Sequence, residues 1–381
     1  MLSLFRLSRL LLMRWRRLTR WEFWPPWVFY GPVALYVLVL MMRFRSLTLF
    51  TAANPAIPAG GVIGESKYEI LAALRQQGAP VPRSTLLSGR SDARAKLAQA
   101  AAFIRTNHLS YPVVLKANQG QRGSGVVMAR GAAALAKYVA AARGDIILQE
   151  YVPGAEFGVF YYRYPSSDRG HIFSITEKQL PVVTGDGRRT VEALILDDDH
   201  AVCMADRHLA RHAALRGAIL RPGARLPLID VASHCRGALF LNGGYLCTPR
   251  VTAAFDEIGR RYDGFFFGRF DVRAPSRAAF QDGQFQIIEL NGVTSEATHI
   301  YHPGTSLLAA YRVLCRQWRI AFEIGRENAA RGAAPASITL LHRLFREYRA
   351  AARWHLRPEG TAPAGDPAEA GLPDGRVEPC C

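Results

Sequence analysis

The stretch Gly268-Arg-Phe-Asp-Val272, followed after a short insertion by Phe285-Gln-Ile-Ile-Glu-Leu-Asn291, decides the fold. Both segments have the apolar, β-rich composition of strands, and we expect the two strands to be neighbours in one sheet. Glu289 and Asn291 are two residues apart, so their side chains point to the same face. Burying the carboxylates of Asp271 and Glu289 would cost folding free energy without a cation beside them. Glu289 and Asn291 form, together with Asp271, a set of oxygen ligands that suits Mg²⁺ bridging nucleotide phosphates.

Two earlier segments carry complementary groups. Lys116 lies in the strand-like run 111–117 and is followed by a glycine-rich loop at 118–125, whose N–H groups can close over phosphate oxygens. The stretch Gln149-Glu-Tyr-Val-Pro-Gly-Ala-Glu156 leads from a strand into a turn that can offer backbone groups to an adenine ring and an acid to ribose. Each signal is weak alone, because glycine hairpins and strand–turn–strand units are common.

The predicted elements mix helices with antiparallel hairpins, which favours an α+β fold over a doubly wound sheet. Helices are predicted over residues 66–77, 94–106, 132–142 and 334–357, the last of them basic and amphipathic. Strands are predicted over residues 46–51, 111–117, 126–129, 145–151, 157–162, 171–176, 264–271 and 285–290. Residues 358–381 have the composition of a disordered tail.

The charge of the chain indicates an anionic partner. The formal net charge is +17, from 48 basic and 31 acidic residues, which fits nucleic acid, anionic lipid or nucleotide phosphate. Eight arginines lie in the first 45 residues and bracket an apolar, aromatic stretch, and no nucleic-acid-binding motif is present. We therefore expect no nucleic-acid partner and an anionic membrane surface instead. The six cysteines lack metal or disulfide spacing and indicate reduced thiols.

Residues 23–42 contain no charge and are just long enough to cross a bilayer, but three prolines interrupt them. Trp and Tyr residues in and beside the segment are typical of a membrane interface. A crossing helix with its basic end in the cytoplasm would leave the rest of the chain outside, away from ATP. We therefore favour an in-plane or re-entrant anchor at the cytoplasmic face over a true span, with a hairpin packed on the domain as the remaining alternative.

Taken in order, these segments resemble the ATP-grasp superfamily over about residues 65–325, and are similar to D-alanine–D-alanine ligases and to the ATP-grasp part of cyanophycin synthetase. The resemblance implies two α+β lobes that grip ATP, here preceded by the membrane-associated segment. It predicts this division: 1–45 membrane-associated segment, 46–104 N-terminal element, 105–155 small lobe, 156–330 large lobe with the metal and substrate site, 331–357 basic helix, 358–381 disordered tail.

The resemblance also implies roles for individual residues. The implied ATP-binding residues are Lys67, Lys116, Gly123, Ser124, Gly125, Gln149, Glu150, Val152, Glu156 and Lys178. Arg269, Lys178 and Lys116 would be catalytic, and Asp271, Glu289 and Asn291 would bind Mg²⁺ or Mn²⁺. Beyond Asn291 the chain lacks the Pro-Gly stretch of a D-alanine ligase. Directly after the metal strand, we predict that four residues face the acceptor substrate, although a purely structural role has equal weight for each of them: Ser295, Glu296, His299 and Tyr301.

The implied reaction is transfer of the ATP γ-phosphoryl group to a carboxylate, followed by attack of an amine on the acylphosphate. The predicted protein is thus a ligase that joins a small-molecule acid to an amino acid, a peptide or an envelope precursor. The alternative is a catalytically weak ATP-grasp sensor that binds nucleotide and docks at the membrane.

Overall fold

The computed structural model describes residues 2–120 and 125–355, which form two compact units. The larger unit contains residues 30–178 and 240–355, and the smaller contains residues 2–29 and 179–239. The predicted tail at 358–381 and the loop residues Gly123 and Ser124 lie outside the described residues. The predicted lobe boundaries stay a prediction.

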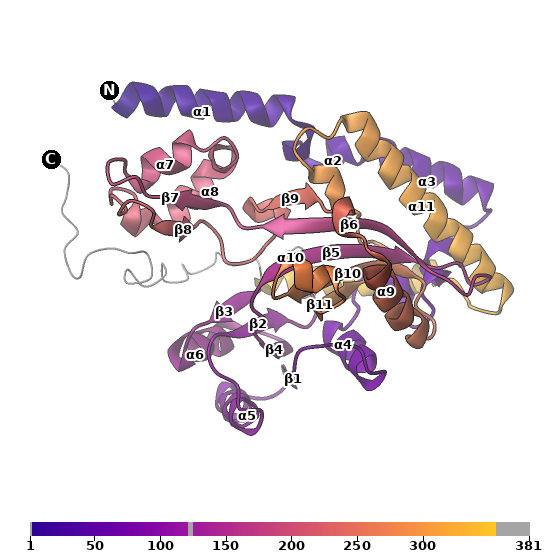
Figure 1. Cartoon of the computed structure of the whole chain (residues 1–381). Coiled ribbons are helices and arrows are strands. Elements are labelled where there is room, and N and C mark those ends of the chain that lie inside the picture. Colours follow the sequence, from indigo (N-terminus) through magenta and orange to yellow (C-terminus); the bar gives the residue numbers. More distant parts are fainter. Residues whose placement is uncertain (1, 121–124, 356–381) are drawn as a thin grey trace. The chain divides into compact units, whose positions relative to one another are not determined.

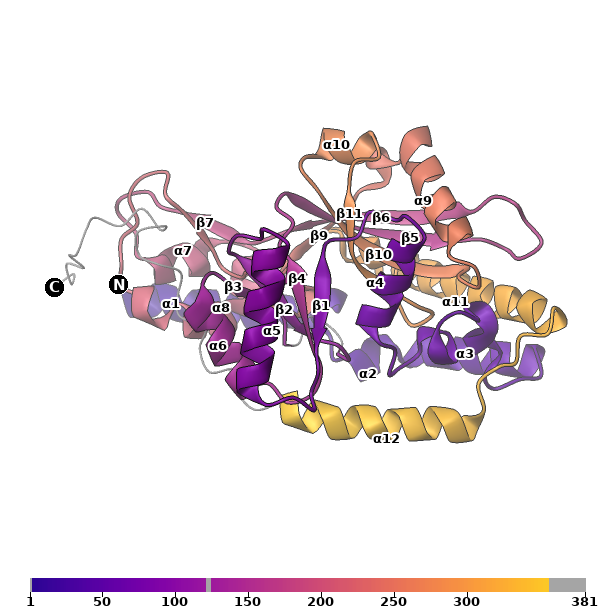
Figure 2. The same cartoon turned by 90° about the horizontal axis from the view of Figure 1, so that it is seen from below.

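The larger unit holds a four-stranded antiparallel sheet in the order β1-β4-β2-β3 (Figure 1). The strands are β1 (Ser84–Leu87), β2 (Val113–Ala117), β3 (Val127–Ala129) and β4 (Ile146–Glu150). Helices α5 (Ala93–Thr106) and α6 (Ala132–Ala141) accompany this sheet (Figure 2). Leu135 and Val139 of α6 share one buried cluster with Leu115 and Leu148 of the strands, and this apolar contact holds the sheet and helices together.

The second sheet of the larger unit has the order β11-β10-β5-β6-β9. Its strands are β5 (Ala155–Tyr162), β6 (His171–Gln179), β9 (Leu239–Asn242), β10 (Phe267–Ala274) and β11 (Gln286–Asn291). Alternate residues of β5 and β10, among them Phe157 and Phe270, enter an apolar cluster with Phe255 and Phe280. These last two come from α9 (Pro249–Arg261) and α10 (Arg277–Gln281). On the opposite face, Phe160 and Phe267 enter a second apolar cluster, and charged side chains occupy neighbouring positions of the same strands.

Three further helices complete the larger unit besides α4 (Lys67–Gln76): α3 (Gly31–Arg43), α11 (Leu307–Ala330) and α12 (Ile338–His355). The predicted start of α4 is confirmed, because the Ser66 side chain accepts a hydrogen bond from the Glu69 N–H. Helix α3 packs along α11, and α12 follows α11 along one side of the unit in Figure 2. The 24-residue helix α11 was not predicted.

The predicted strand at 46–51 is wrong, because the chain forms a 3₁₀ helix over Leu49–Ala53. The reason is Asn54, which is completely buried. Its side chain accepts hydrogen bonds from the N–H groups of Phe266 and Phe267 and donates to the Gly60 and Phe267 carbonyls. A polar side chain with four partners stabilises a compact turn here in place of a strand.

The smaller unit consists of α1 (Leu2–Thr19), α2 (Pro26–Phe29), α7 (Val191–Asp197), α8 (Ala205–Arg211) and a hairpin of β7 (Val182–Thr184) with β8 (Arg225–Pro227). Met13 of α1 is buried in one apolar cluster with Val191 and Leu194 of α7. Residues 23–42 do not form one helix, since α2 ends at Phe29 and α3 begins two residues later with Pro32 in its first turn. Among the described residues, we find no helix with the length and apolar character needed to cross a bilayer.

Candidate active site

The candidate site is a row of charged side chains on one face of the five-stranded sheet. Four adjacent strands contribute to it in spatial order, β11, β10, β5 and β6. On each strand the contributing residues are two apart and therefore share a face. They are Glu289 and Asn291 on β11, Arg269, Asp271 and Arg273 on β10, Glu156 and Gly158 on β5, and Thr176 and Lys178 on β6.

Asp271 lies at the centre of this row. Its cross-strand partners are Glu289 on one side and Gly158 on the other. The Arg269 Nε lies 2.9 Å from the Asp271 Oδ1, and the Lys178 Nζ lies 3.0 Å from the same atom. Burial alone would raise the pKa of Asp271, but the charges of Arg269 and Lys178 lower it below its ordinary value, so this carboxylate is ionised.

Lys178 connects Asp271 to Glu156, whose Oε1 lies 2.9 Å from its Nζ. Burial would lower the pKa of Lys178, but the charges of Asp271 and Glu156 raise it above its ordinary value. The predicted phosphate lysine and the predicted ribose acid are therefore ion-paired cross-strand partners. A nucleotide that uses both must exchange this contact for its own.

Glu289 forms the second carboxylate of the row. The Lys67 Nζ, at the first turn of α4, lies 2.7 Å from its Oε1. Burial would raise the pKa of Glu289, while the charge of Lys67 lowers it below the ordinary value. Asn291 donates from Nδ2 to the Asp271 Oδ2 at 3.4 Å. The three residues predicted to bind a metal are thus brought together on one face.

Lys116 reaches the row from the four-stranded sheet. Its Nζ donates to the Ile288 carbonyl of β11 at 2.8 Å and to the Gln149 Oε1 at 3.0 Å. Burial lowers its pKa to about 8, against the opposing charge of Glu289. A buried lysine whose hydrogen-bond partners are uncharged gains favourable interactions when an anion arrives, which suits contact with a phosphate.

The predicted adenine linker has some of its polar groups already engaged. The Glu150 side chain pairs with Arg83, with 2.8 Å between Oε1 and NH2, and the Val152 carbonyl accepts from the Arg273 NH1 at 2.6 Å. The Gln149 Nε2 is buried without a hydrogen-bond partner. Gly125, the described end of the glycine-rich loop, has a left-handed φ of +71° and accepts a hydrogen bond from the Tyr138 hydroxyl. The roles of these residues toward ATP stay predictions.

The four residues predicted to face the acceptor directly follow β11, and one of them forms an unexpected contact. The Glu296 carboxylate accepts from the Tyr301 hydroxyl at 3.0 Å and from the Tyr30 hydroxyl at 2.8 Å. The two tyrosine hydroxyls are 3.1 Å apart. Burial beside Glu296 raises the pKa of Tyr301 well above its ordinary value, so this phenol stays protonated as a donor. Arg269 donates to the Glu296 carbonyl at 3.0 Å, which connects this cluster to the row.

Ser295 and His299 differ from that pair. The Ser295 Oγ is buried without a hydrogen-bond partner, while its carbonyl accepts from the Gln317 side chain of α11 at 2.6 Å. Burial lowers the pKa of His299, so the imidazole is neutral. Ser295 therefore has a free hydroxyl for a ligand, whereas His299 is half-buried in the short helix Thr298–Tyr301.

Sequence analysis missed Tyr30, Arg273 and Gly158. Tyr30 precedes the predicted fold by more than thirty residues and was assigned to the membrane segment, so its position gave no signal. Arg273 could have been found, because it continues the two-residue spacing of Arg269 and Asp271 on one strand. A Cβ on Gly158 would stand 3.3 Å from both the Arg269 Cδ and the Asp271 Oδ1, so the glycine makes room for the row.

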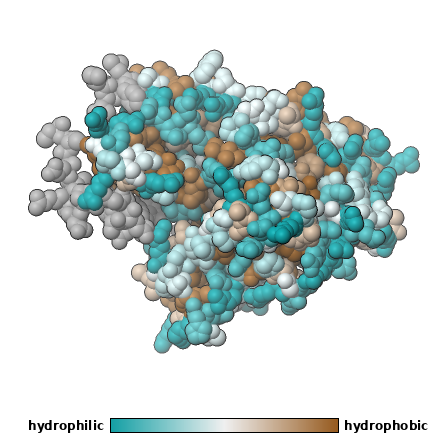
Figure 3. All heavy atoms as spheres, in the orientation of Figure 1, coloured by the Kyte–Doolittle hydropathy of each residue, from teal (hydrophilic) through white to brown (hydrophobic). Residues whose placement is uncertain are grey.

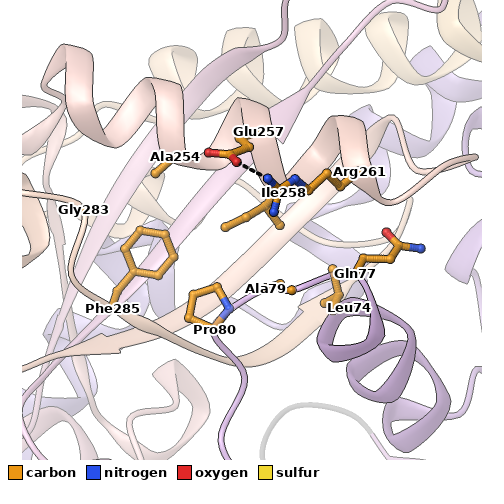
Figure 4. A pocket seen from close by; sticks show the side chains of 11 residues that line it. Leu74, Gln77, Ala79, Pro80, Ala254, Glu257, Ile258, Arg261, Gly283 and Phe285 are labelled. Carbon is orange, nitrogen blue, oxygen red and sulfur yellow. Dashed lines mark ion pairs between the residues drawn. The ribbon is translucent and has the colours of Figure 1, made fainter.

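A separate cavity of about 190 Å³ lies between α4 and α9 and does not involve the row (Figure 4). Glu257 and Arg261 form an ion pair at its edge, and Leu74, Pro80 and Phe285 give it an apolar lining.

Within the described parts of the chain, His, Cys, Asp and Glu side chains form no group of three that could hold a metal by themselves. A metal bound by two carboxylates and an amide would have coordination positions left for phosphate oxygens and water.

Part of the chain is similar to a known family, and several solved structures match it at low identity. Residues 64–157 match the RimK-like ATP-grasp domain family. No curated protein sequence matches the chain. Among solved structures, D-alanine–D-alanine ligase from Bacillus anthracis has 14% identity and a TM-score of 0.40, covering 70% of this chain and 69% of that one. The D-cycloserine synthetase DcsG has 13% identity and a TM-score of 0.41, covering 79% of this chain and 86% of that one. The bifunctional glutathione synthetase from Pasteurella multocida has 15% identity and a TM-score of 0.37, covering 65% of this chain and 35% of that one.

The match places a RimK-like ATP-grasp domain in residues 64–157, which include β1 to β4 and the start of β5.

Proposed function

We propose that the enzyme activates a small-molecule carboxylate as an acylphosphate and joins it to an amine of an amino acid, a peptide or an envelope precursor. A carboxylate oxygen attacks the γ-phosphorus of ATP, and the bond to the β,γ-bridging oxygen breaks to release ADP. The amine nitrogen then attacks the acyl carbon, inorganic phosphate leaves, and the amine loses a proton. The observation that carries this proposal is the row of cations and carboxylates across four adjacent strands.

The cations of the row suit phosphoryl transfer, because in this reaction the charge spreads over phosphate oxygens and catalysis consists mostly of correctly placed positive charge. Lys67, Lys116 and Lys178 would each contact phosphate. Arg269 would contact the transferred group, since its guanidinium is held by Asp271 on one side and by the Glu296 carbonyl on the other.

Asp271, Glu289 and Asn291 fit Mg²⁺ by the chemistry of their oxygen donors and by their common face. When bound there, Mg²⁺ would neutralise phosphate charge and draw the phosphate oxygens to this edge of the row. The ion pairs of Lys67 with Glu289 and of Lys178 with Asp271 hold these carboxylates ionised and oriented.

Glu296 is our candidate for the residue that binds the acceptor amine. Its carboxylate is partly exposed and is oriented by two tyrosine hydroxyls, both of which act as donors to it. A carboxylate is suited to an ammonium group, which brings only hydrogen-bond donors. Ser295, with its buried and unpartnered hydroxyl, would contact the same substrate.

The test is interception of the acylphosphate by hydroxylamine. The full-length chain is incubated with Mg²⁺·ATP, the small molecules of a cell extract and hydroxylamine, and ADP and hydroxamates are measured. A truncated chain would lose Tyr30 and α3, so full length is essential. We expect ADP release with a hydroxamate whose mass identifies the acid.

The Asp271→Asn variant should lose both products, while Asp282→Asn, which removes a carboxylate paired with Arg250 at the surface, should keep them. Hydroxamate formation that survives in Asp271→Asn would contradict the proposed site. Tight ATP binding with neither product in any extract would favour a nucleotide sensor over a ligase.

A further inference from the structure

Helix α1 exposes an apolar stripe on one face. Leu7, Leu11, Trp15 and Leu18 follow a spacing of four, four and three residues, which places them on one side of the helix. Their exposed fractions are 55%, 55%, 65% and 72%, respectively. An amphipathic helix of a soluble domain ordinarily buries such a stripe.

The opposite face of α1 holds the helix on its own unit, largely through arginines. The Arg9 NH2 lies 2.9 Å from the Asp197 Oδ1, and the Arg16 NH1 lies 2.9 Å from the Asp199 Oδ1. Met13 is buried on this side. The polarity of α1 is thus reversed with respect to an ordinary surface helix, and the outward stripe contributes nothing to packing within the unit.

Helix α3, in the larger unit, has the same kind of outward face. Leu35, Leu38, Val39 and Met42 are 66%, 51%, 51% and 70% exposed and follow a spacing of three, one and three residues. Its inner face, with Val33 and Leu40 buried, packs along α11. Figure 3 shows that apolar residues reach the surface between charged ones on the face of the molecule that it draws.

Basic side chains lie beside both stripes, and an exposed indole lies on the short helix between α1 and α3 in the sequence. Arg14 and Arg17 are exposed on α1, and Arg43 and Arg45 are exposed at the end of α3. Trp27 of α2 is 80% exposed. Apolar residues with arginines beside them and a tryptophan nearby are typical of a helix at a bilayer interface. There the apolar side chains enter the acyl boundary and the arginines meet anionic headgroups.

We infer that the outward face of α1 and the outward face of α3 each dock on the surface of an anionic lipid bilayer, each helix lying in the plane of the interface. The occupant is a lipid surface because each stripe is bordered by positive charge and carries no acidic side chain, whereas a protein groove would supply specific counter-groups. The docking does not depend on the proposed ligase chemistry. If that chemistry is correct, the surface is cytoplasmic, where ATP is available.

The test is flotation of the full-length chain with vesicles. Vesicles of phosphatidylcholine with 30% phosphatidylglycerol, on the order of a typical anionic content, should carry the protein, and pure phosphatidylcholine should carry markedly less. Replacing Leu11 or Leu38 by Ser should weaken partition about tenfold each, as expected for one inserted leucine. Leu308→Ser on α11, at 59% exposure, is the matched control and should bind like the parent.

Equal binding of the Leu11→Ser, Leu38→Ser and parent chains would overturn the inference. A dimer in lipid-free solution that both stripe variants dissociate, without any lipid partition of the parent, would also overturn it and assign the faces to a second copy. Thermal melting verifies that each variant is folded. Loss of ATP turnover in the parent would leave the docking result intact, so failures of the two proposals are distinguishable.

Discussion

Asp271 and Glu289 are direct cross-strand partners on β10 and β11, yet each is neutralised by different cations. Asp271 pairs with Arg269 and Lys178, and Glu289 pairs with Lys67. Two carboxylates at adjacent positions of an antiparallel pair repel each other unless cations lie between or beside them. In the proposed reaction, nucleotide phosphates would bind the lysines in place of the carboxylates and free both carboxylates for a metal.

The first prediction concerns the order of metal and nucleotide binding. Because both carboxylates are ion-paired, we expect Mn²⁺ to bind weakly to the protein alone and at least tenfold more tightly with a non-hydrolysable ATP analogue, since nucleotide phosphates add ligands. Electron paramagnetic resonance of free Mn²⁺ measures this directly. Lys67→Met removes the Glu289 partner, so it should strengthen nucleotide-free Mn²⁺ binding. Unchanged Mn²⁺ affinity on adding nucleotide would contradict the coupling.

The second prediction concerns Glu289 in catalysis. Glu289→Gln should lower kcat by about 10²–10³, the effect typical of removing one preorganised electrostatic contact. ADP release at saturating ATP measures it. Glu257→Gln, which removes an exposed acid paired with Arg261 far from the row, is the control and should retain full activity.

The third prediction concerns pH. Burial lowers the pKa of Lys116 to about 8, so its charge is present below that pH and is lost as pH rises through it. ATP affinity should therefore fall as pH rises above about 8, as measured by titration calorimetry across pH 7–9.5. Lys116→Arg keeps its charge throughout and should remove this dependence, whereas Lys116→Met should bind ATP weakly at every pH. The effect of pH on the free energy of unfolding has the opposite sign to its effect on ATP affinity.

Between pH 8 and the ordinary lysine pKa, the unfolded chain holds a proton on Lys116 that the folded chain has lost. This group therefore makes folding more favourable as pH rises through that window.

The fourth prediction concerns the hydroxyls on Glu296. Tyr30→Phe and Tyr301→Phe each remove a hydrogen bond to a carboxylate, an interaction worth about 1.5–3 kcal/mol. We expect the KM for the natural amine to rise about tenfold or more, while hydroxamate formation with hydroxylamine stays near that of the parent. An equal loss with both nucleophiles would indicate that these tyrosines only support the fold.

The fifth prediction concerns the close approach of two glycines, Gly61 and Gly292, the second of which directly follows β11. A Cβ on Gly61 would lie 2.7 Å from the Gly292 Cα, and Gly61 has a φ of +81°. Gly61→Ala should therefore lower the melting temperature by more than 5 °C, on the order of a clash plus left-handed strain. Gly304 has a φ of +88° but open space around it, so Gly304→Ala measures the strain alone and should cost clearly less.

Much of the sheet architecture could be predicted from sequence, because strand residues with period two carry both the core and the site on opposite faces. The run 285–290 predicted β11 to within one residue, and Asp271 and Glu289 were expected on adjacent strands. The strand at 264–271 was predicted three residues too early, because Phe265 and Phe266 are apolar and buried but belong to the turn that Asn54 holds. No local pattern shows that a distant asparagine will satisfy those N–H groups.

The sequence indicated which residues form the site more readily than it indicated which of them contact one another. Resemblance assigned Lys178 to phosphate and Glu156 to ribose, but their mutual ion pair depends on β5 and β6 being aligned residue to residue. Tyr30 lies more than 260 positions from Glu296, and neither spacing nor composition connects them. The exposed stripes of α1 and α3 were expected only as a general membrane tendency of residues 1–45. Which side chains face outward depends on the tertiary partners of each helix.

The hydrogen bond from Tyr30 to Glu296 connects the N-terminal segment to the proposed amine site. Tyr30 lies before residue 45, whereas the three lysines proposed to contact phosphate lie in α4, β2 and β6. If Glu296 binds the amine as proposed, exchange of the segment before residue 45 would change the choice of amine and leave the proposed phosphate contacts in place. Substitutions at Tyr30 are therefore a direct route to new amide products in the proposed reaction.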